Sequence, residues 1–363
     1  MADRATLLNA ERKALAFAEQ HNFVGTDPYD GLLSPAARHL RGPRVRQAWV
    51  QAHKHLGSRT RKVTGVRPIV MTKALALFSQ GATLASRPDL ANRLLDRILQ
   101  EKGAGPWGYE FDVQTRWAHY PAYSPNVVST VFTLRAFAAA NRLNDVSDDT
   151  LAWLTSLQDP AGYFRYTESS SRLIHNGSLL AAEGIDLLGG DRGMVADAVA
   201  MTVEKQAVDG SWPYGEGPGL EWIDSFHTIY NLDSLMFLYQ RGYSALDAIK
   251  KGYTYWVEHC LSTRGVPLYF AGDSKESTDV HNVATSVGFL ARMCEFQDCR
   301  VNSVPAISHL LSLQGHDGGF RNTPRSLPHM RWNQGHAYLA LSHWLVPQPF
   351  VATKANDGFS SND

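Results

Sequence analysis

The chain has 363 residues, of which 44% are hydrophobic and 19% are charged, so it can bury a large core and extensive disorder is excluded. Its 35 basic and 35 acidic side chains cancel. No overall electrostatic field therefore favours nucleic acid or an anionic membrane as a partner.

The N-terminal stretch MADRATLLNAERKALAF has charges within every apolar run, so we expect no signal peptide. No run approaches the roughly 18 apolar residues that a membrane-spanning helix needs. Cys260, Cys294 and Cys299 are odd in number and lack CxxC spacing, a pattern that favours a reducing compartment over a disulfide framework. Together these features predict a cytoplasmic protein.

One segment near the N-terminus is strongly basic. Arg38–Lys62, RHLRGPRVRQAWVQAHKHLGSRTRK, has eleven Arg, Lys or His residues and no acid. It is either a solvated face or a docking surface for an anionic carrier or polymer, and it is available for a peripheral contact. Nucleic acid is not predicted as its partner.

A repeat runs through the rest of the chain. QDPAGYF from Gln158, QAVDGSW from Gln206 and QGHDGGF from Gln314 each place an aromatic residue six positions after a glutamine. Looser copies are QEKGAGPW from Gln100 and STRGVPLY around Gly265. The repeats are about fifty residues apart, which is the length of a helical hairpin with its loops.

The segments between the repeated turns read as alternating helices. An amphipathic segment precedes each turn, as in DLANRLLDRILQEKG or ALDAIKKGYTYWVEHCL, and a more uniformly apolar one follows it. This order predicts an all-α fold, an α/α toroid of five to six helical hairpins with inner and outer helix rings. We expect short hairpins in the loops at one end, such as YFRYTESSSRLI.

We predict a single domain over residues 1–352. In this prediction, residues 1–63 supply N-terminal helices and the basic segment that complete the ring. Residues 353–363 are expected to form a disordered tail.

The Gln…Gly-x-Trp/Phe turns resemble the repeats of the terpenoid cyclase and protein prenyltransferase superfamily, whose shared fold is an α/α toroid. The likeness covers roughly Lys73 to Trp344. More narrowly, DPYDGLLSP at Asp27, DGSWPYGEG at Asp209, DSFHTIYNLDSL and DVHNVATS resemble bacterial toroid proteins associated with polysaccharide assembly. The resemblance implies the architecture and leaves the chemistry open.

Inner helices of a toroid run in the same direction, so their N-termini meet at one end of the axis. We expect them to begin at about Pro125, Ile174, Ile223, Asp279 and Trp332. Their first turns and the loops before them contain the candidate substrate-binding residues, which are polar groups and aromatic rings suited to stacking on sugars: Trp107, Tyr109, Trp117, Tyr123, Asn126, His175, Asn176, Trp212, Tyr214, Trp222, Arg331, Trp332 and Gln334.

The candidate catalytic residues in the same cluster are Asp224, His227, Tyr269, Asp279, His281 and His336. Both aspartates stand where N-caps belong and could be caps alone. The three histidines are different, because histidine is a poor cap and they recur at corresponding positions of successive inner helices. We therefore expect a functional cleft here.

Two chemistries fit this cluster, and a third lacks its acid. Acid/base chemistry on a sugar, as in uronate epimerisation or β-elimination, would use His227 or Tyr269 as base and Arg331 on the substrate carboxylate. Hydrolysis would use Asp224 with Asp279. Class II terpenoid cyclisation needs an Asp-x-Asp-Asp acid, but the nearest string, DVSDD from Asp145, reads as a helix cap.

Cofactor chemistry is not expected, with one alternative. The superfamily resemblance implies a zinc site in its prenyltransferases, formed by an Asp-x-Cys pair and a later histidine. Here Asp279, His281 and His336 stand at those positions, with His281 in place of the cysteine, and two histidines with a carboxylate are a legitimate zinc sphere.

The preferred prediction is a carbohydrate-active enzyme of polysaccharide biosynthesis that acts on a polymer or carrier-linked oligosaccharide. The alternatives are a terpenoid cyclase- or prenyltransferase-like enzyme acting on an isoprenoid, with zinc in one version, and a non-catalytic glycan-binding toroid.

Overall fold

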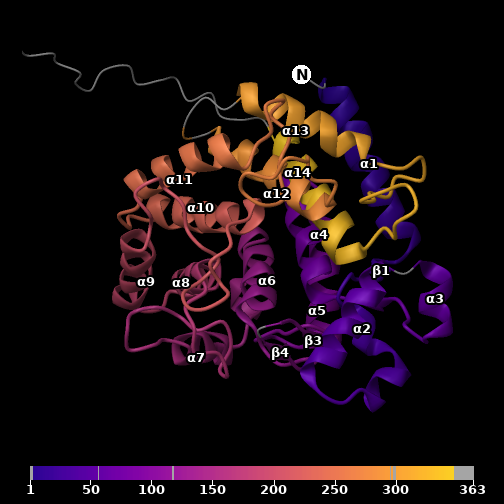
Figure 1. Cartoon of the computed structure of the whole chain (residues 1–363), viewed down its shortest axis with the longest axis horizontal. Helices are drawn as coiled ribbons and strands as arrows, with labels where there is room; N and C mark the ends of the chain where they lie inside the picture. The colour runs from indigo at the N-terminus through magenta and orange to yellow at the C-terminus, as the bar shows by residue number, and fades with distance from the viewer. Residues whose placement is uncertain (1–2, 56, 117, 295, 297–299, 347–363) are drawn as a thin grey trace, which may run out of the picture.

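A computed structural model describes residues 3–55, 57–116, 118–294, 296 and 300–346 (Figure 1). Six inner helices form a closed ring in which each contacts the next and the last contacts the first. They are α4 (Thr72–Leu84), α6 (Val127–Ala139), α8 (His175–Leu187), α10 (Ser225–Gln240), α12 (Val280–Met293) and α14 (His336–Leu345). Their side chains are buried over most of the circumference, as the apolar sequences predict.

Outer helices pack against this ring. They are α5 (Pro88–Lys102), α7 (Asp148–Ser156), α9 (Arg192–Glu204), α11 (Leu246–His259), α13 (Arg300–Ser312) and α1 (Arg4–Gln20). The predicted α/α toroid is thus confirmed. Among the described residues, no helix is both long and apolar enough to cross a membrane.

In two copies, the glutamine of the repeated turn bonds the outer helix that follows the turn. The side-chain Nε2 of Gln206 donates to the carbonyl of Ala248 in α11, and that of Gln314 donates to the carbonyl of Ala10 in α1. The last turn therefore contacts α1 as an earlier turn contacts α11. Helix α1 takes the outer position beside α14 and closes the ring (Figure 1).

The rest of the N-terminal segment lies elsewhere. Helices α2 (Pro43–His55) and α3 (Ser58–Val63) sit at the end of the toroid where the inner helices begin, and α2 contacts strand β3 (Val113–Gln114). The expectation that the basic segment completes the ring is thus wrong for α2 and α3. The domain bounds stay a prediction, and the tail at 353–363 lies outside the described residues.

Short strands occur at the same end. β3 pairs with β4 (His119–Tyr120), and β1 (Val24–Gly25) pairs with β2 (Ile69–Val70), both antiparallel. The hairpin predicted within residues 163–174 is not formed. There Ile174 bridges to Gly215 and Phe164 to Gln158, because the loop pairs with neighbouring turns instead of with itself.

The cysteines differ from the expectation of reduced thiols. Cys260 is a buried free thiol, whereas Cys294 is disulfide-bonded. Cys299 lies outside the described residues.

Candidate functional site

A cavity of about 720 Å³ opens where the inner helices begin. The starts of α4, α6, α8, α10 and α12 and the π-helical turn Met330–Gly335 before α14 all contribute to its wall, so the predicted meeting of the N-termini is observed. Ten aromatic side chains contribute to its wall. The rings are those of Tyr29, Tyr109, Tyr120, Tyr166, Tyr214, Trp222, Tyr230, Tyr269, Phe270 and Trp332.

Asp224 and His227 form a coupled pair at one side of this cavity. Asp224 is the N-cap of α10, where its Oδ1 accepts the backbone N–H of His227 at 2.8 Å. Its Oδ2 lies 2.6 Å from Nδ1 of the His227 ring and accepts the indole N–H of Trp222 at 3.2 Å. The carboxylate thereby favours a proton on Nδ1, which leaves Nε2 of a cavity-lining imidazole as the basic nitrogen.

Tyrosine rings lie close to this imidazole. The ring of Tyr214 lies 4.5 Å from that of His227 and stacks on Trp222 at the same distance. Burial raises the pKa of Tyr214 well above its ordinary value, and it also raises the pKa of Tyr269. The raised pKa favours the protonated phenols, which suits them as proton donors, and the role of Tyr269 as a base stays a prediction.

The floor of the cavity has a second polar pair. The hydroxyl of Tyr230 lies 2.8 Å from Nε2 of His281, and the His281 ring stacks on Trp332 with centroids 4.1 Å apart. His336 stands edge-on to His281 at 4.3 Å, but it faces a smaller cavity at the opposite end of the ring. Burial lowers the pKa of both imidazoles well below the ordinary value, so both are neutral.

Lys73, at the start of α4, also lines the cavity and is only 4% exposed. Its Nζ lies 3.8 Å from the ring centroid of Phe132, a cation–π distance. Burial, and next the charge of Arg331, lower the pKa of this amine well below its usual value. An anionic ligand group beside Lys73 would restore its charge.

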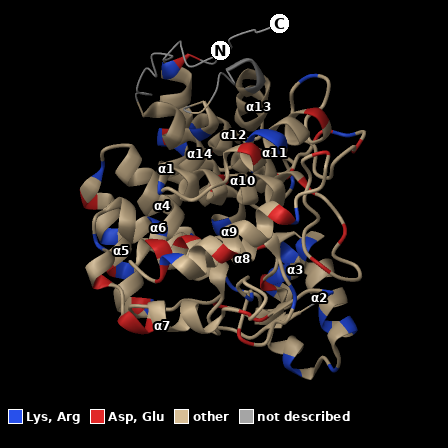
Figure 2. Cartoon of the chain, turned by 90° about the vertical axis from the view of Figure 1, so that its left-hand side faces the viewer, with Lys and Arg blue, Asp and Glu red and all other residues tan. Residues whose placement is uncertain are grey.

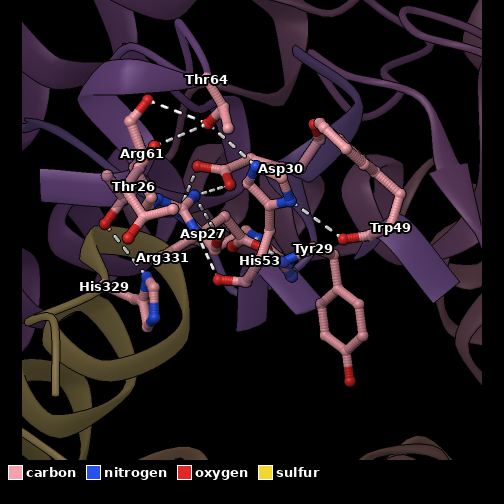
Figure 3. Close-up of polar contacts among 12 residues, drawn as sticks. Thr26, Asp27, Tyr29, Asp30, Trp49, His53, Arg61, Thr64, His329 and Arg331 are labelled. Atoms are coloured by element: carbon pink, nitrogen blue, oxygen red, sulfur yellow. Dashed lines mark hydrogen bonds and ion pairs between the residues drawn. The ribbon is translucent and has the colours of Figure 1, made fainter. Parts of the chain in front are cut away.

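Arg331 is anchored by a buried carboxylate (Figure 3). Its Nε and Nη2 donate to the two oxygens of Asp27 at 2.7 and 2.8 Å. Its guanidinium lies 5.4 Å from the ring of Tyr109 and 5.3 Å from that of Trp332. Arg331 therefore lines the cavity as predicted, but Asp27 occupies the fork that was expected to bind substrate.

A neighbouring ion pair supports this arrangement. Arg61 pairs with Asp30 and donates to the carbonyl of Asp27, and Asp30 accepts the backbone N–H of Asp27 (Figure 3). The motif DPYDGLLSP thus supplies two buried acids to two buried arginines from distant parts of the chain.

The cavity wall contains three arginines and one lysine. Lys73, Arg116, Arg172 and Arg331 line it, whereas no Asp or Glu does so among the described residues. Asp224 lies behind His227 and Trp222. Asp279 caps α12 through the N–H groups of His281 and Asn282 and accepts the indole N–H of Trp332.

The predicted site residues therefore separate into two groups. Those that line the cavity are Tyr109, Asn176, Tyr214, Trp222, His227, Tyr269, His281, Arg331 and Trp332. Those that do not are Trp107, Tyr123, Asn126, His175, Trp212, Asp224, Asp279, Gln334 and His336. Trp117 lies outside the described residues.

Several members of the second group have structural roles. Trp107 and Trp212 are the aromatic residues of the repeat and are buried, with Trp212 donating to the carbonyl of Thr202. Asn126 caps α6, and Gln334 exchanges two hydrogen bonds with the backbone of Phe320. Tyr123 is 67% exposed, whereas His175 is buried beneath Glu216.

Among the described residues, the structure does not arrange Asp279, His281 and His336 as a zinc ligand set. Within the part of the chain that the structure describes, no group of three or more His, Cys, Asp or Glu residues is placed to hold a metal ion. The carboxylate of Asp279 is engaged by Trp332 and by backbone N–H groups. Zinc at Asp279, His281 and His336 stays a prediction that metal analysis would test.

Sequence reasoning missed Tyr29, Lys73 and Tyr230. Tyr29 lies inside DPYDGLLSP, and Tyr230 is one turn after His227, so a helical count from His227 could have found it. Lys73 begins an apolar segment, TKALALF, where a lone lysine on an otherwise buried helix was the available signal.

Comparisons with known proteins show that solved structures share the fold of this chain, at low sequence identity. No protein-family model matches the chain, and no curated protein sequence matches it. A type II terpene cyclase from Scytonema, solved with the product merosterolic acid A, is similar with a TM-score of 0.58 and 15% identity, over 94% of this chain and 98% of its own.

Two other solved structures have the same architecture. A possible member of the GH105 family from Salmonella enterica serovar Paratyphi A has a TM-score of 0.62 and 12% identity over 94% of both chains. The ent-copalyl diphosphate synthase of Streptomyces platensis has a TM-score of 0.52 and 16% identity, over 88% of this chain and 60% of its own. The chain thus has the α/α-toroid fold of these proteins.

Proposed function

We propose that the protein is an enzyme of polysaccharide biosynthesis that removes the proton beside the carboxylate of a uronate residue. The single observation that supports this is the Asp224–His227 pair, which presents a basic imidazole nitrogen to a cavity lined by basic side chains and tyrosines but by no described carboxylate. The cytoplasmic location and the glycan or carrier-linked partner are parts of the same proposal.

The reaction follows from these groups. Nε2 of His227 takes the proton from C5, whose acidity the adjacent carboxylate provides, and the resulting imidazolium is stabilised by Asp224. In β-elimination the C5–H electron pair forms a C4–C5 double bond, the C4–O bond breaks, and a tyrosine hydroxyl protonates the leaving oxygen. In epimerisation a proton instead returns to C5 from the opposite face.

The hydrolytic version of the prediction is less well supported. Glycosidases place two carboxyl groups on either side of the scissile bond. Here Asp224 is engaged by His227 and Trp222, and Asp279 by Trp332 and backbone N–H groups, and neither lines the cavity.

An isoprenoid-acting enzyme is the second candidate. The density of rings around the cavity favours it, because aromatic faces stabilise carbocations, and terpene cyclases share the fold. Initiation by a carboxylic acid, however, lacks a cavity-lining Asp or Glu among the described residues.

The test is a proton-exchange experiment. Purified protein is incubated in deuterated water with polygalacturonate, alginate and hyaluronan, and with carboxyl-reduced versions of each. We expect deuterium at C5 or an unsaturated, ultraviolet-absorbing product from at least one acidic polymer and from no reduced one.

His227→Ala should lower this rate about 100- to 10,000-fold, the usual contribution of a general base. His316→Ala is the control, because His316 is exposed and does not line the cavity. New reducing ends without unsaturation would replace the proposal with hydrolysis. Turnover of geranylgeranyl diphosphate, with none of any glycan, would favour the second candidate, whereas binding without turnover of either would favour the non-catalytic toroid.

A further inference from the structure

The basic segment lies beside the cavity, because two residues of α2, Gln47 and Gln51, line it. Of its eleven basic residues, two are internal: Arg61 pairs with Asp30, and His53 bonds Trp49 and Thr64. The other nine are exposed or half-buried on α2, α3 and the turn before them, and we call them the basic band: Arg38, His39, Arg41, Arg44, Arg46, Lys54, His55, Arg59 and Lys62. In Figure 2 the blue of Lys and Arg positions recurs along the ribbon of α2 and α3.

The basic band is not neutralised locally. Residues 31–67 contain no Asp or Glu. Among the salt bridges of the described residues, none involves a member of the band. A group of like charges without counter-charges produces a positive potential that extends about a Debye length, roughly 10 Å, into solvent.

The band continues into the cavity along one face of α2. Gln47 and Gln51 line the cavity, and Lys54 lies over the ring of Tyr29, another lining residue, at 5.3 Å. Arg44 lies three residues before Gln47 and so lies on the same helix face, one turn farther out. This face of α2 therefore presents Arg44, Gln47, Gln51 and Lys54 in a row. The row leads from solvent to the site.

We propose that the basic band is a docking track for the part of an acidic polysaccharide that extends beyond the cavity. The inference rests on the proposed function, because it takes the reacting residue of that polymer to be a uronate. Helix α2 has 13 residues and is thus about 20 Å long, which spans several sugar units. The glutamines between the cations suit hydroxyl groups, so the row matches a chain that has both carboxylates and hydroxyls.

The test compares a long substrate with a short one. The double variant Arg41→Glu with Arg44→Glu reverses two exposed charges of the band without altering the cavity wall. Arg44 is in the first turn of α2, where glutamate is favourable, and Arg41 precedes the helix, so α2 should remain folded. We expect KM for a uronate polymer to rise about tenfold or more at low salt, with kcat unchanged, and KM for a uronate oligosaccharide that only fills the cavity to stay constant.

The matched control is Arg93→Glu with Lys250→Glu, which reverses two exposed charges on the outer helices α5 and α11. It should leave both KM values unchanged. Equal effects of the band variant on polymer and oligosaccharide would overturn the inference, as would a polymer KM that does not respond to it.

Direct binding separates this inference from the proposed function. Calorimetric titration of the His227→Ala protein with the polymer needs no turnover. Weaker binding after the Arg41 and Arg44 reversals would support the track even if no uronate is converted. Tighter binding to anionic phospholipid vesicles than to the acidic polymer would assign the band to a membrane and overturn the proposal.

Discussion

At the scale of single residues, the two aspartate caps show how one sequence signature supports different roles. Asp224 and Asp279 both cap inner helices. Asp224 is also hydrogen-bonded to the imidazole of His227, whereas Asp279 accepts a hydrogen bond from the indole of Trp332. The cap could be predicted from position alone. The second partner could not, because it depends on side-chain packing in the finished ring.

Asp224→Asn should separate the two roles of that residue. Asparagine is an equally good cap, so stability should change by less than about 1 kcal/mol. Its amide cannot hold the proton on Nδ1 of His227 as a carboxylate does, so turnover should fall about 100- to 10,000-fold. Thermal denaturation and the deuterium-exchange rate measure the two effects.

The control is Asp191→Asn at the N-cap of α9, which should alter neither quantity, because Asp191 bonds only backbone N–H groups. Undiminished exchange in Asp224→Asn would show that the carboxylate does not orient the base.

The buried Asp27–Arg331 pair gives a second prediction. Both side chains are at most 5% exposed. Asp27→Ala would leave a buried guanidinium without its carboxylate, and the free energy of unfolding should fall by about 3–5 kcal/mol. Urea denaturation measures this loss. Asp317→Ala removes the partner of Arg321 in a half-exposed pair and should cost no more than about 1 kcal/mol. Similar losses in both variants would contradict the structural role of the buried pair.

At the scale of elements, the repeated turn explains why the fold was readable from the sequence. In the turns at Gln206 and Gln314 the glutamine and the glycine both contact the next outer helix, so the motif marks places where a hairpin meets its successor. Gly210 has a φ of +91°, and a Cβ there would lie 2.4 Å from the carbonyl oxygen of Lys251 in α11. Gly318 stands in the same relation to Lys13 in α1, with 2.4 Å to its carbonyl oxygen.

This geometry predicts that a glycine-to-alanine substitution lowers the free energy of unfolding by different amounts at Gly162 and Gly210. Gly162 also has a φ of +91°, but its Cβ would meet no atom closer than 3.6 Å. Gly162→Ala should therefore lose only the left-handed conformational energy, about 1–2 kcal/mol. Gly210→Ala should lose about 1–3 kcal/mol more through the steric clash. Equal losses in urea denaturation would mean that the turn relaxes away from α11.

The elements that the sequence did not predict are those without a repeat. The alternation of apolar and amphipathic segments sufficed for the inner and outer helices. The places of α2 and α3, the β3–β4 hairpin and the π-helical turn before α14 depend on packing between distant segments. For the same reason Tyr29 and Asp27, from the N-terminal loop, were not expected beside Arg331, about 300 residues later in the chain.

At the scale of the whole molecule, the toroid buries several neutral histidines, both along its axis and where distant segments of the chain meet. Burial lowers the pKa of His329 to about 4, and its Nδ1 bonds the hydroxyl of Thr26 at 3.0 Å, where the N-terminal loop meets the π-helical turn. Burial also lowers the pKa of the histidines at four further positions: His175, His281, His336 and His343.

These shifts predict that the fold weakens in mild acid. Below about pH 6.5 the unfolded chain takes up protons on these imidazoles while the folded chain does not, so stability falls as the pH drops from about 6.5 towards 4. For His329 alone the upper limit is about 3 kcal/mol, because each pKa unit corresponds to about 1.4 kcal/mol. His329→Gln keeps a polar group beside Thr26 without the titration, so it should flatten the decline of the melting temperature between pH 7 and pH 5. His316→Gln, at an exposed position, should leave that decline unchanged, and equal slopes in all three proteins would show that His329 is protonated in the folded state.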